Sequence, residues 1–335
     1  MSQLKTTILT SYILQMPLSV LDLFCGCGGM TQGLIQAGLN VVAGIDVWDK
    51  AISSYSANFP AHQAICADLR ELPPEEFQAR HNSANVKFDL IVGGPPCQGF
   101  SIAGKRAPDD PRSSLFMEYV KYLNFYQPKA FIMENVIGIL SAKTPSGEKA
   151  IDVILEQFQQ NYNCIVCKLY ASDFEVPQNR RRVIIIGIRK DLGIQPTEPM
   201  PLYTEAKRPA VGTVLLPREE VEASYYLSQK AIDGMNNRRA SARSKGHGFG
   251  AQILDPAKPS YTISARYYKD GSDALVKYSE TEIRRLTPLE LRRIQGFPDD
   301  YILLGNKKEV CMQIGNAVAG RFAYHLGKHI EQLLV

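Results

Sequence analysis

The sequence predicts an α/β protein, with a doubly wound, mostly parallel sheet and a second, smaller domain rich in strands and loops. The first observation is that short apolar runs alternate with helical patterns from residue 18 to residue 160. Such a βαβα rhythm is typical of a parallel sheet covered by helices on both faces. The second observation is that the rhythm stops near residue 190, where Pro196, Pro199 and Pro201 open a linker-like stretch.

Four strand-and-helix units are expected in the first half of the chain. The expected strands are 18–24, 41–46, 90–92 and 130–133, and the expected helices are 31–37, 50–58, 115–126 and 150–160. Two further apolar runs, 164–170 and 182–188, follow one another with a short connection and no helix. We therefore expect them to form an antiparallel hairpin at the end of the sheet.

The domain boundaries are expected where the pattern changes. Residues 1–190 are expected to form the first domain, 191–283 the smaller one, 284–311 a hinge segment, and 312–335 a terminal helix that returns to the first domain. Within the smaller domain, 260–268 has the pattern of a strand that leads into a hairpin turn at Lys269-Asp270-Gly271. In the hinge, Thr287-Pro288-Leu289-Glu290 has the spacing of a helix capping box.

Composition restricts the class of protein. The net charge of +4 is that of an ordinary soluble protein, so any nucleic-acid contact has to come from local basic clusters. The seven cysteines are scattered and odd in number, which indicates a reducing compartment. The interrupted apolar run over 8–20 predicts neither a signal peptide nor a membrane span. Neighbouring cysteines lack the further ligands that zinc requires, so no metal site is expected.

A glycine-rich loop, 22–30, joins the first expected strand to the first helix. Its backbone amides and the helix start suit a polar ligand, although Thr31 breaks the dinucleotide-binding pattern. Asp46 ends the second expected strand, where a carboxylate accepts hydrogen bonds from ribose hydroxyls. Trp48 is placed to stack on an adenine, and Asp68 to meet its amino group. These features favour an adenosine-bearing cofactor over a ligand-free loop, without separating NAD from S-adenosylmethionine.

Cys97 lies in the turn Gly94-Pro95-Pro96-Cys97-Gln98, directly after an expected strand. Proline stiffens a turn, and a thiol at the carboxyl end of a strand faces the edge where α/β proteins bind ligands. Glu134 follows the next expected strand, and Arg180 and Arg182 lie at the start of the last one. If these strands are neighbours, a thiol, a carboxylic acid and two guanidinium groups meet at one edge of the sheet.

This combination suits covalent catalysis on an electron-poor ring such as cytosine. A thiolate that adds to C6 gives C5 the electron density to accept a methyl group. Glu134 would assist at N3 and the two arginines at O2, and nearby arginines favour ionisation of the thiol. Each residue also has an ordinary structural explanation, such as a helix cap, a solvated charge run or a buried thiol. Their occurrence at three successive strand ends favours catalysis.

In these residues the chain resembles the DNA (cytosine-5) methyltransferases, most closely the bacterial restriction-modification enzymes. The resemblance covers most of the chain outside 191–283 and follows the order of motifs in the family. The motifs are Asp22-Leu23-Phe24 with Gly26 and Gly28-Gly29, Gly94 to Ser101, Met133 to Val136, Gln178 to Val183, Arg285 to Pro298, and Gln313 to Val318. The resemblance implies the Rossmann-like fold of class I S-adenosylmethionine-dependent methyltransferases, with 191–283 as a target-recognition domain.

The resemblance also implies roles for individual residues. Cys97 would attack C6 of a cytosine flipped out of the duplex, and Glu134 would contact N3. Arg182 would hold the base, and Arg180 would support the loop and the intermediate. S-adenosylmethionine would be bound by the glycine loop and by residues at strand ends, namely Phe24, Gly26, Gly28, Gly29, Asp46, Trp48, Asp68, Pro95, Asn316 and Val318. The family more often has glutamate at the position of Asp46.

Double-stranded DNA is the implied substrate, methylated at a specific sequence. DNA contacts are expected from a mobile loop after Cys97 and from basic residues of the smaller domain, namely Gln98, Ser101, Arg112, Arg238, Arg239, Arg243, Lys245 and Arg266. The implied enzyme is a monomer of the bacterial cytoplasm that protects DNA from a partner restriction endonuclease. The alternative is a tRNA cytosine-5 methyltransferase of the same fold. A nucleotide-binding oxidoreductase and a regulator without catalysis do not explain Cys97 and Glu134.

Overall fold

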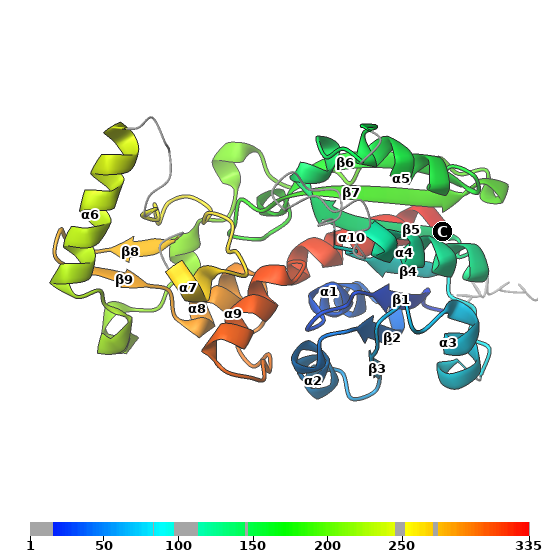
Figure 1. The fold of residues 1–335 in the computed structure, drawn as a ribbon, viewed down its shortest axis with the longest axis horizontal. Coiled ribbons are helices and arrows are strands. Elements are labelled where there is room, and N and C mark those ends of the chain that lie inside the picture. The colour runs from blue at the N-terminus through cyan, green and yellow to red at the C-terminus, as the bar shows by residue number, and fades with distance from the viewer. Residues whose placement is uncertain are drawn as a thin grey trace, which may run out of the picture.

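The computed structural model describes residues 16–82, 84–96, 113–144, 147–244, 252–270 and 274–334, with the backbone alone of 113, 114, 238–244 and 270. Two lobes lie side by side in Figure 1. The large lobe is built on a central sheet, and the small lobe consists of helices around a two-stranded hairpin.

The sheet of the large lobe has seven strands in the order β3-β2-β1-β4-β5-β7-β6. The first five strands in that order are parallel, and β7 is antiparallel to both β5 and β6. This arrangement confirms the expected, mostly parallel sheet with an antiparallel hairpin at its end. The strands are β1 (Ser19–Leu23), β2 (Asn40–Asp46), β3 (Gln63–Cys66), β4 (Leu90–Gly93), β5 (Ala130–Val136), β6 (Tyr162–Tyr170) and β7 (Arg181–Arg189).

Helices cover both faces of this sheet, which is why its central strands are apolar on both sides. The helices of the large lobe are α1 (Gly29–Gln36), α2 (Asp49–Asn58), α3 (Pro74–His81), α4 (Ser113–Tyr126), α5 (Ala150–Phe158) and α10 (Gly320–Leu334). On one face, α1 and α10 bury Leu34 and Leu326 in a common core. On the other face, α3, α4 and α5 bury Phe77, Phe116 and Ile154 in a second core.

The small lobe has a core of its own, which includes Val211, Ile263, Leu291 and Ile314. Its elements are α6 (Gln229–Ser244), α7 (Tyr267–Asp270), β8 (Leu275–Lys277), β9 (Ile283–Arg285), α8 (Pro288–Ile294) and α9 (Lys307–Asn316). The expected capping box at the start of α8 is confirmed. The Glu290 amide donates to Thr287 Oγ1 at 3.2 Å, and the Thr287 amide donates to the Glu290 carboxylate at 2.8 Å.

Two expectations about the second half of the chain were wrong. Residues 260–268 do not form a strand: Ser260 makes an isolated bridge, and Tyr267 begins the short helix α7, which includes the expected turn residues Lys269 and Asp270. The backbone of Ile263 instead bonds to side chains of the large lobe, so it cannot join a strand ladder. The terminal helix is also interrupted, because Ala317 is extended, with φ −63° and ψ 147°, between α9 and α10.

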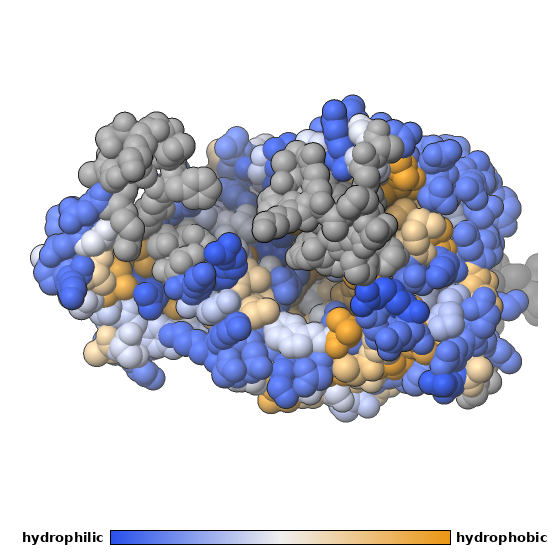
Figure 2. Space-filling view, in the orientation of Figure 1, coloured by the Kyte–Doolittle hydropathy of each residue, from blue (hydrophilic) through white to orange (hydrophobic). Residues whose placement is uncertain are grey.

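The molecular surface on the side seen in Figure 2 is mostly hydrophilic over both lobes.

The cysteines that the structure describes are free thiols, namely Cys25, Cys27, Cys66, Cys164, Cys167 and Cys311. Among the described helices, none is long and apolar enough to cross a membrane.

Candidate active site

A cavity of about 530 Å³ opens at the carboxyl ends of the parallel strands. Its walls come from the loops after β1, β2, β3, β4 and β5, from the start of β7, and from the junction between α9 and α10. Ligands of open α/β sheets bind at this edge, because the strand order reverses there and leaves a crevice between the loops. The cavity therefore defines the candidate site.

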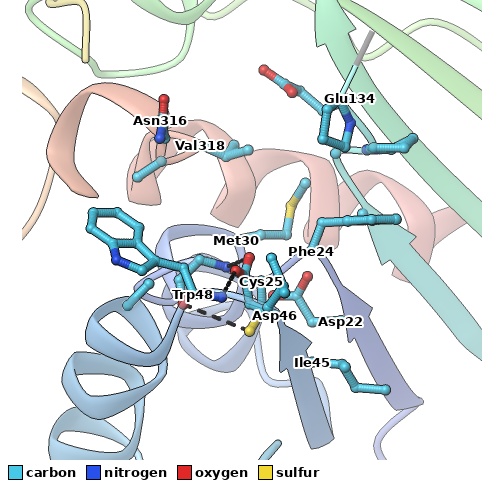
Figure 3. A pocket seen from close by; sticks show the side chains of 18 of the residues that line it. Asp22, Phe24, Cys25, Met30, Ile45, Asp46, Trp48, Glu134, Asn316 and Val318 are labelled. Carbon is cyan, nitrogen blue, oxygen red and sulfur yellow. Dashed lines mark hydrogen bonds between the residues drawn. The ribbon is translucent and has the colours of Figure 1, made fainter. Parts of the chain in front are cut away.

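Asp46 connects the two loops that form one wall of this cavity (Figure 3). The Gly26 amide donates to Asp46 Oδ2, and the Trp48 amide donates to Asp46 Oδ1, both at 2.9 Å. Burial raises the pKa of the Asp46 carboxyl group, while the hydrogen bonds from the two backbone amides lower it. Each carboxylate oxygen has a second lone pair, so Asp46 can order the loops and still accept a hydrogen bond from a ligand.

The remaining predicted cofactor residues divide into two groups. Phe24, Gly26, Trp48, Asp68, Pro95, Asn316 and Val318 all line the cavity with Asp46. Figure 3 shows the Trp48 indole across the cavity from Asn316 and Val318. Asp68 also pairs with Arg70, whose hydrogen bond lowers the pKa of the Asp68 carboxyl group.

Gly28 and Gly29, by contrast, do not line the cavity. A Cβ atom on Gly28 would overlap the Phe59 ring, and one on Gly29 would overlap the carbonyl oxygen of Val318. Gly28 also has a φ of +95°, which side chains rarely adopt. These two glycines therefore let α1 pack closely against its neighbours, and the expected ligand contact is replaced by a packing role.

Asp22 lies beneath the cofactor loop and lines the cavity, although sequence reasoning gave it no site role of its own. Its side chain is buried and accepts a hydrogen bond from Thr31 Oγ1 at 2.6 Å. Burial raises the pKa of the Asp22 carboxyl group to about 7, against the lowering effect of Thr31. The signals in the sequence were the position of Asp22 at the end of the first strand and its place in the motif Asp22-Leu23-Phe24.

Glu134 and Arg182 meet at the other end of the cavity, as their strand positions led us to expect. Val136 of β5 is paired with Arg182 of β7, so the two side chains start from neighbouring strands. Arg182 Nε lies 2.6 Å from Glu134 Oε1, and each side chain is largely buried, with 12% and 13% exposed. A carboxyl group and a guanidinium group are thus held together at the cavity wall.

The turn that leads to Cys97 lies beside this pair. Asn135 Nδ2 donates to the carbonyl oxygen of Pro95 at 3.0 Å, which fixes the turn to the end of β5. A Cβ atom on Gly94 would lie 3.2 Å from Glu134 Oε2. Asn135 was not predicted as a site residue, and its place next to Glu134 in the sequence was the available signal. Cys97 itself lies outside the described residues.

Arg180 lines the cavity but is held differently from Arg182. It is buried, with Nη1 donating to the carbonyl oxygen of Ile263 at 3.3 Å and Nη2 donating to that of Gly315 at 3.0 Å. Burial, followed by the nearby Arg182 charge, lowers the pKa of the Arg180 guanidinium group to about 9. The sequence predicts that Arg180 assists at the target cytosine. Its two hydrogen bonds instead go to Ile263 of the small lobe and to Gly315 of α9.

Unpartnered polar atoms gather at this cavity. Within the described part of the chain, five buried side-chain nitrogen or oxygen atoms make no hydrogen bond, and one of them, Arg182 Nε, has the Glu134 carboxylate as its ion-pair partner. Two of the others, Arg180 Nε and Gln313 Oε1, belong to residues that line the cavity. Buried polar groups in folded proteins are usually satisfied, so this cluster fits a cavity that receives a polar ligand.

Comparison with known proteins identifies the family. Residues 18–332 match the profile of the C-5 cytosine-specific DNA methylase family. The chain belongs to this family. It is a DNA (cytosine-5) methyltransferase, as the six sequence motifs had led us to expect.

Individual relatives support the same conclusion about the methyltransferase. It is 35% identical to the Type II methyltransferase M1.HphI of Haemophilus parahaemolyticus, over 97% of this chain and 90% of that protein. It is 33% identical to the Type II methyltransferase M1.ScrFI of Lactococcus lactis, over 90% of this chain and 74% of that protein. The structure of S. pombe Dnmt2 methyltransferase shares the fold, with a TM-score of 0.70, 21% identity, and coverage of 95% and 100% of the two chains.

The predicted DNA contacts of the methyltransferase are only partly described by the structure. Gln98, Ser101, Arg112 and Lys245 lie outside the described residues. Arg238, Arg239 and Arg243 lie on α6, of which the structure gives the backbone at these positions. Figure 1 places α6 at the end of the small lobe away from the sheet. Arg266 is exposed just before α7.

Proposed function

We propose that this methyltransferase transfers the methyl group of S-adenosylmethionine to C5 of a cytosine flipped out of duplex DNA, at a specific sequence. The observation that carries the proposal is the Glu134–Arg182 pair, 2.6 Å apart, in the wall of the cavity that also contains Asp46 and Trp48. The two ends of the cavity suit two ligands that have to react with each other, an adenosine cofactor and a base.

The residues of the cofactor end fit S-adenosylmethionine. Trp48 offers an aromatic face for the adenine, Asp46 an acceptor for the ribose, and Asp22 a buried carboxyl group for the positively charged part of the molecule. Asn316 and Val318 would close the site from the opposite wall. When bound, this cofactor supplies an electrophilic methyl group on a sulfonium ion.

The residues of the other end fit a flipped cytosine. The Cys97 thiolate would add to C6 while Glu134 donates a proton to N3, and C5 then takes the methyl group. The methyl donor would leave as a neutral thioether. Loss of the proton from C5, departure of the Cys97 sulfur and return of the N3 proton to Glu134 would restore the ring. Arg182 would hold O2 with its guanidinium group, which is oriented by Glu134.

A role in restriction-modification is proposed on the basis of the relatives. Both relatives named above are Type II methyltransferases, and methylation of a recognition site blocks the matching endonuclease. Methylation of tRNA is a less well supported alternative, because the family profile that matches the chain is that of DNA methylases.

The experiment that tests the proposed function is methylation of plasmid DNA, followed by bisulfite sequencing. We expect methylcytosine at one short recurring sequence. The Cys97→Ala variant should give none while it still binds S-adenosylmethionine in calorimetry, because most of the predicted cofactor contacts, including the Gly26 loop, Asp46 and Trp48, lie on other strand ends. Cys164→Ala, a half-buried cysteine of β6, is the matched control and should retain activity. Normal turnover by Cys97→Ala would exclude the covalent route, and methylation of tRNA but not of DNA would favour the alternative.

A further inference from the structure

Ile263 is held at both of its backbone polar atoms by side chains of the large lobe. Its amide donates to Gln178 Oε1 at 3.0 Å, and its carbonyl oxygen accepts from Arg180 Nη1 at 3.3 Å. Its own side chain is fully buried in the core of the small lobe. The backbone amide and the carbonyl group of this one residue therefore both bond the small lobe to the segment that leads into β7.

The side chains of Gln178 and Arg180 also make hydrogen bonds to the segments that connect the lobes. Gln178 Nε2 donates to Gln295 Oε1 at 2.7 Å and to the carbonyl oxygen of Ile294 at 3.3 Å. Gln295 Nε2 in turn donates to the carbonyl oxygen of Ala317. Gln178, Arg180 and Gln295 are all buried, with 0%, 2% and 0% exposed. We call Gln178 and Arg180, with the backbone of Ile263, the interlobe clamp.

The packing around the interlobe clamp leaves no room for adjustment. Gly315, whose carbonyl oxygen accepts from Arg180 Nη2 at 3.0 Å, has no side chain, and a Cβ atom there would overlap the backbone of Ser264 and Ala265. Ser260 and Asn179 add backbone hydrogen bonds on one side of the clamp. A shift of the small lobe therefore has to break buried hydrogen bonds, which are costly to leave unmade.

Arg180 of the interlobe clamp also lines the cavity that contains Glu134 and Arg182. Arg180 lies close enough to Arg182 and Glu134 for both charges to influence it. Residues 180 and 182 lie two positions apart at the start of an extended strand, so their side chains leave the chain on the same side. A displaced Arg180 would disturb the ion pair that holds Arg182 in place.

We propose that Gln178 and Arg180 are positioning residues, which lock the small lobe onto the catalytic edge of the sheet so that the base it delivers meets Glu134 and Arg182. This inference rests on the proposed function, and it assigns Arg180 a role through Ile263 and Gly315. Both terminal nitrogens of its guanidinium group donate to carbonyl oxygens there. A lysine has the charge but not the planar fork that reaches two carbonyl groups.

The test compares Gln178→Ala and Arg180→Lys with the matched variants Gln63→Ala and Arg80→Lys, which lie on the exposed edge strand β3 and on the surface of α3. Hydrogen–deuterium exchange is measured on peptides that cover 260–266 in the enzyme without DNA. Exchange of the Ile263 amide should rise about tenfold in Gln178→Ala, which removes its acceptor. Exchange over 260–266 should also rise in Arg180→Lys, which loses the bond to the Ile263 carbonyl oxygen and so loosens this segment. Peptides of β4 and β5 should not change, and the matched variants should behave as wild type.

The second readout is the rate of methyl transfer. It is measured on a DNA duplex that contains the recognition sequence found by bisulfite sequencing with the wild-type enzyme. We expect kcat to fall about 10- to 100-fold in the clamp variants, as for a misplaced reacting group. The dissociation constants for S-adenosylmethionine and for the duplex should stay within about threefold, because the groups that bind them remain. If Gln178→Ala does not fold, Gln178→Met replaces it, since methionine fills a similar space but can neither accept from the Ile263 amide nor donate to Gln295.

The possible outcomes separate this inference from the proposed function. Unchanged exchange over 260–266, or a normal kcat in Arg180→Lys, would overturn the interlobe clamp even if the wild-type enzyme methylates DNA. Weaker S-adenosylmethionine binding with unchanged exchange would also overturn it, because Arg180 would then act on the cofactor. Failure of the wild-type enzyme to methylate DNA would contradict the proposed function, whereas the exchange measurement would still test the contact between the lobes.

Discussion

Asp22 is a residue whose titration can be followed without any substrate. Its pKa of about 7 in the folded protein lies above the value of 3.8 that it has when exposed. Between these values the folded chain retains a proton that the unfolded chain has lost, so the contribution of Asp22 to stability falls as the pH rises from about 4 to 7. Above pH 7 the folded protein carries the full cost of a buried charge.

We therefore predict that Asp22→Asn removes this pH dependence. The free energy of unfolding of the variant relative to wild type should increase between pH 4.5 and 7.5, by about 3 kcal/mol. Urea unfolding of the cofactor-free proteins at several pH values measures the difference. If the free energies of unfolding of the variant and of wild type change in parallel with pH over this range, Asp22 ionises as an exposed aspartate does.

Among the described residues, Glu134 is the one that should affect chemistry most without affecting the fold. Glu134→Gln removes the carboxyl group, which pairs with Arg182 and would carry the proton to N3. We expect single-turnover methyl transfer to slow by about 10²- to 10⁴-fold, the usual contribution of general acid catalysis. Cofactor affinity, measured by calorimetry, should stay near that of wild type. Full activity in Glu134→Gln would require another source for the proton at N3.

The start of helix α1 gives a prediction for a single element. A methyl group on Gly29 would overlap the Val318 carbonyl oxygen, which belongs to the backbone and cannot swing aside. We expect Gly29→Ala to lower the free energy of unfolding by about 1–3 kcal/mol, as overpacking usually does. Gly138→Ala is the control, because the nearest atom to a Cβ there is 4.0 Å away. Equal stability of the two variants in urea would contradict the close packing of α1.

Several elements could be predicted from the sequence, and the failures have physical causes. The central strands β1, β4 and β5 were found because they are largely buried on both faces and read as continuous apolar runs. The segment around Ile263 has the same kind of pattern, yet its hydrogen bonds go to Gln178 and Arg180, more than 80 residues earlier in the chain. Such distant side-chain partners leave no local signal in the sequence.

Residues of the site were predictable to different degrees. Glu134 and Arg182 could be brought together from strand order alone, because each lies at a strand end on the same edge. Gly28 and Gly29 could not be told from ligand-binding glycines, since a glycine that admits a neighbouring ring looks the same in sequence as one that admits a cofactor.

At the scale of the whole molecule, DNA binding should depend strongly on salt. The net charge is only +4, so affinity has to come from basic side chains gathered along the DNA-facing surface. Release of counterions from several phosphates predicts a loss of affinity of at least about 100-fold between 50 and 200 mM salt. Fluorescence anisotropy with a labelled duplex measures it. An affinity that stays constant over this range would argue against duplex DNA as the substrate.

Because the junction between α9 and α10 forms part of the cofactor cavity, the cavity is complete only after that late segment has been synthesised. One wall of the cavity comes from Phe24 and Asp46, and the opposite wall from Asn316 and Val318, nearly 300 residues later. A nascent chain on the ribosome therefore cannot build a complete binding site for the methyl donor until the segment after α9 has emerged. Newly made enzyme thus becomes able to modify DNA only after the segment that follows α9 has been translated.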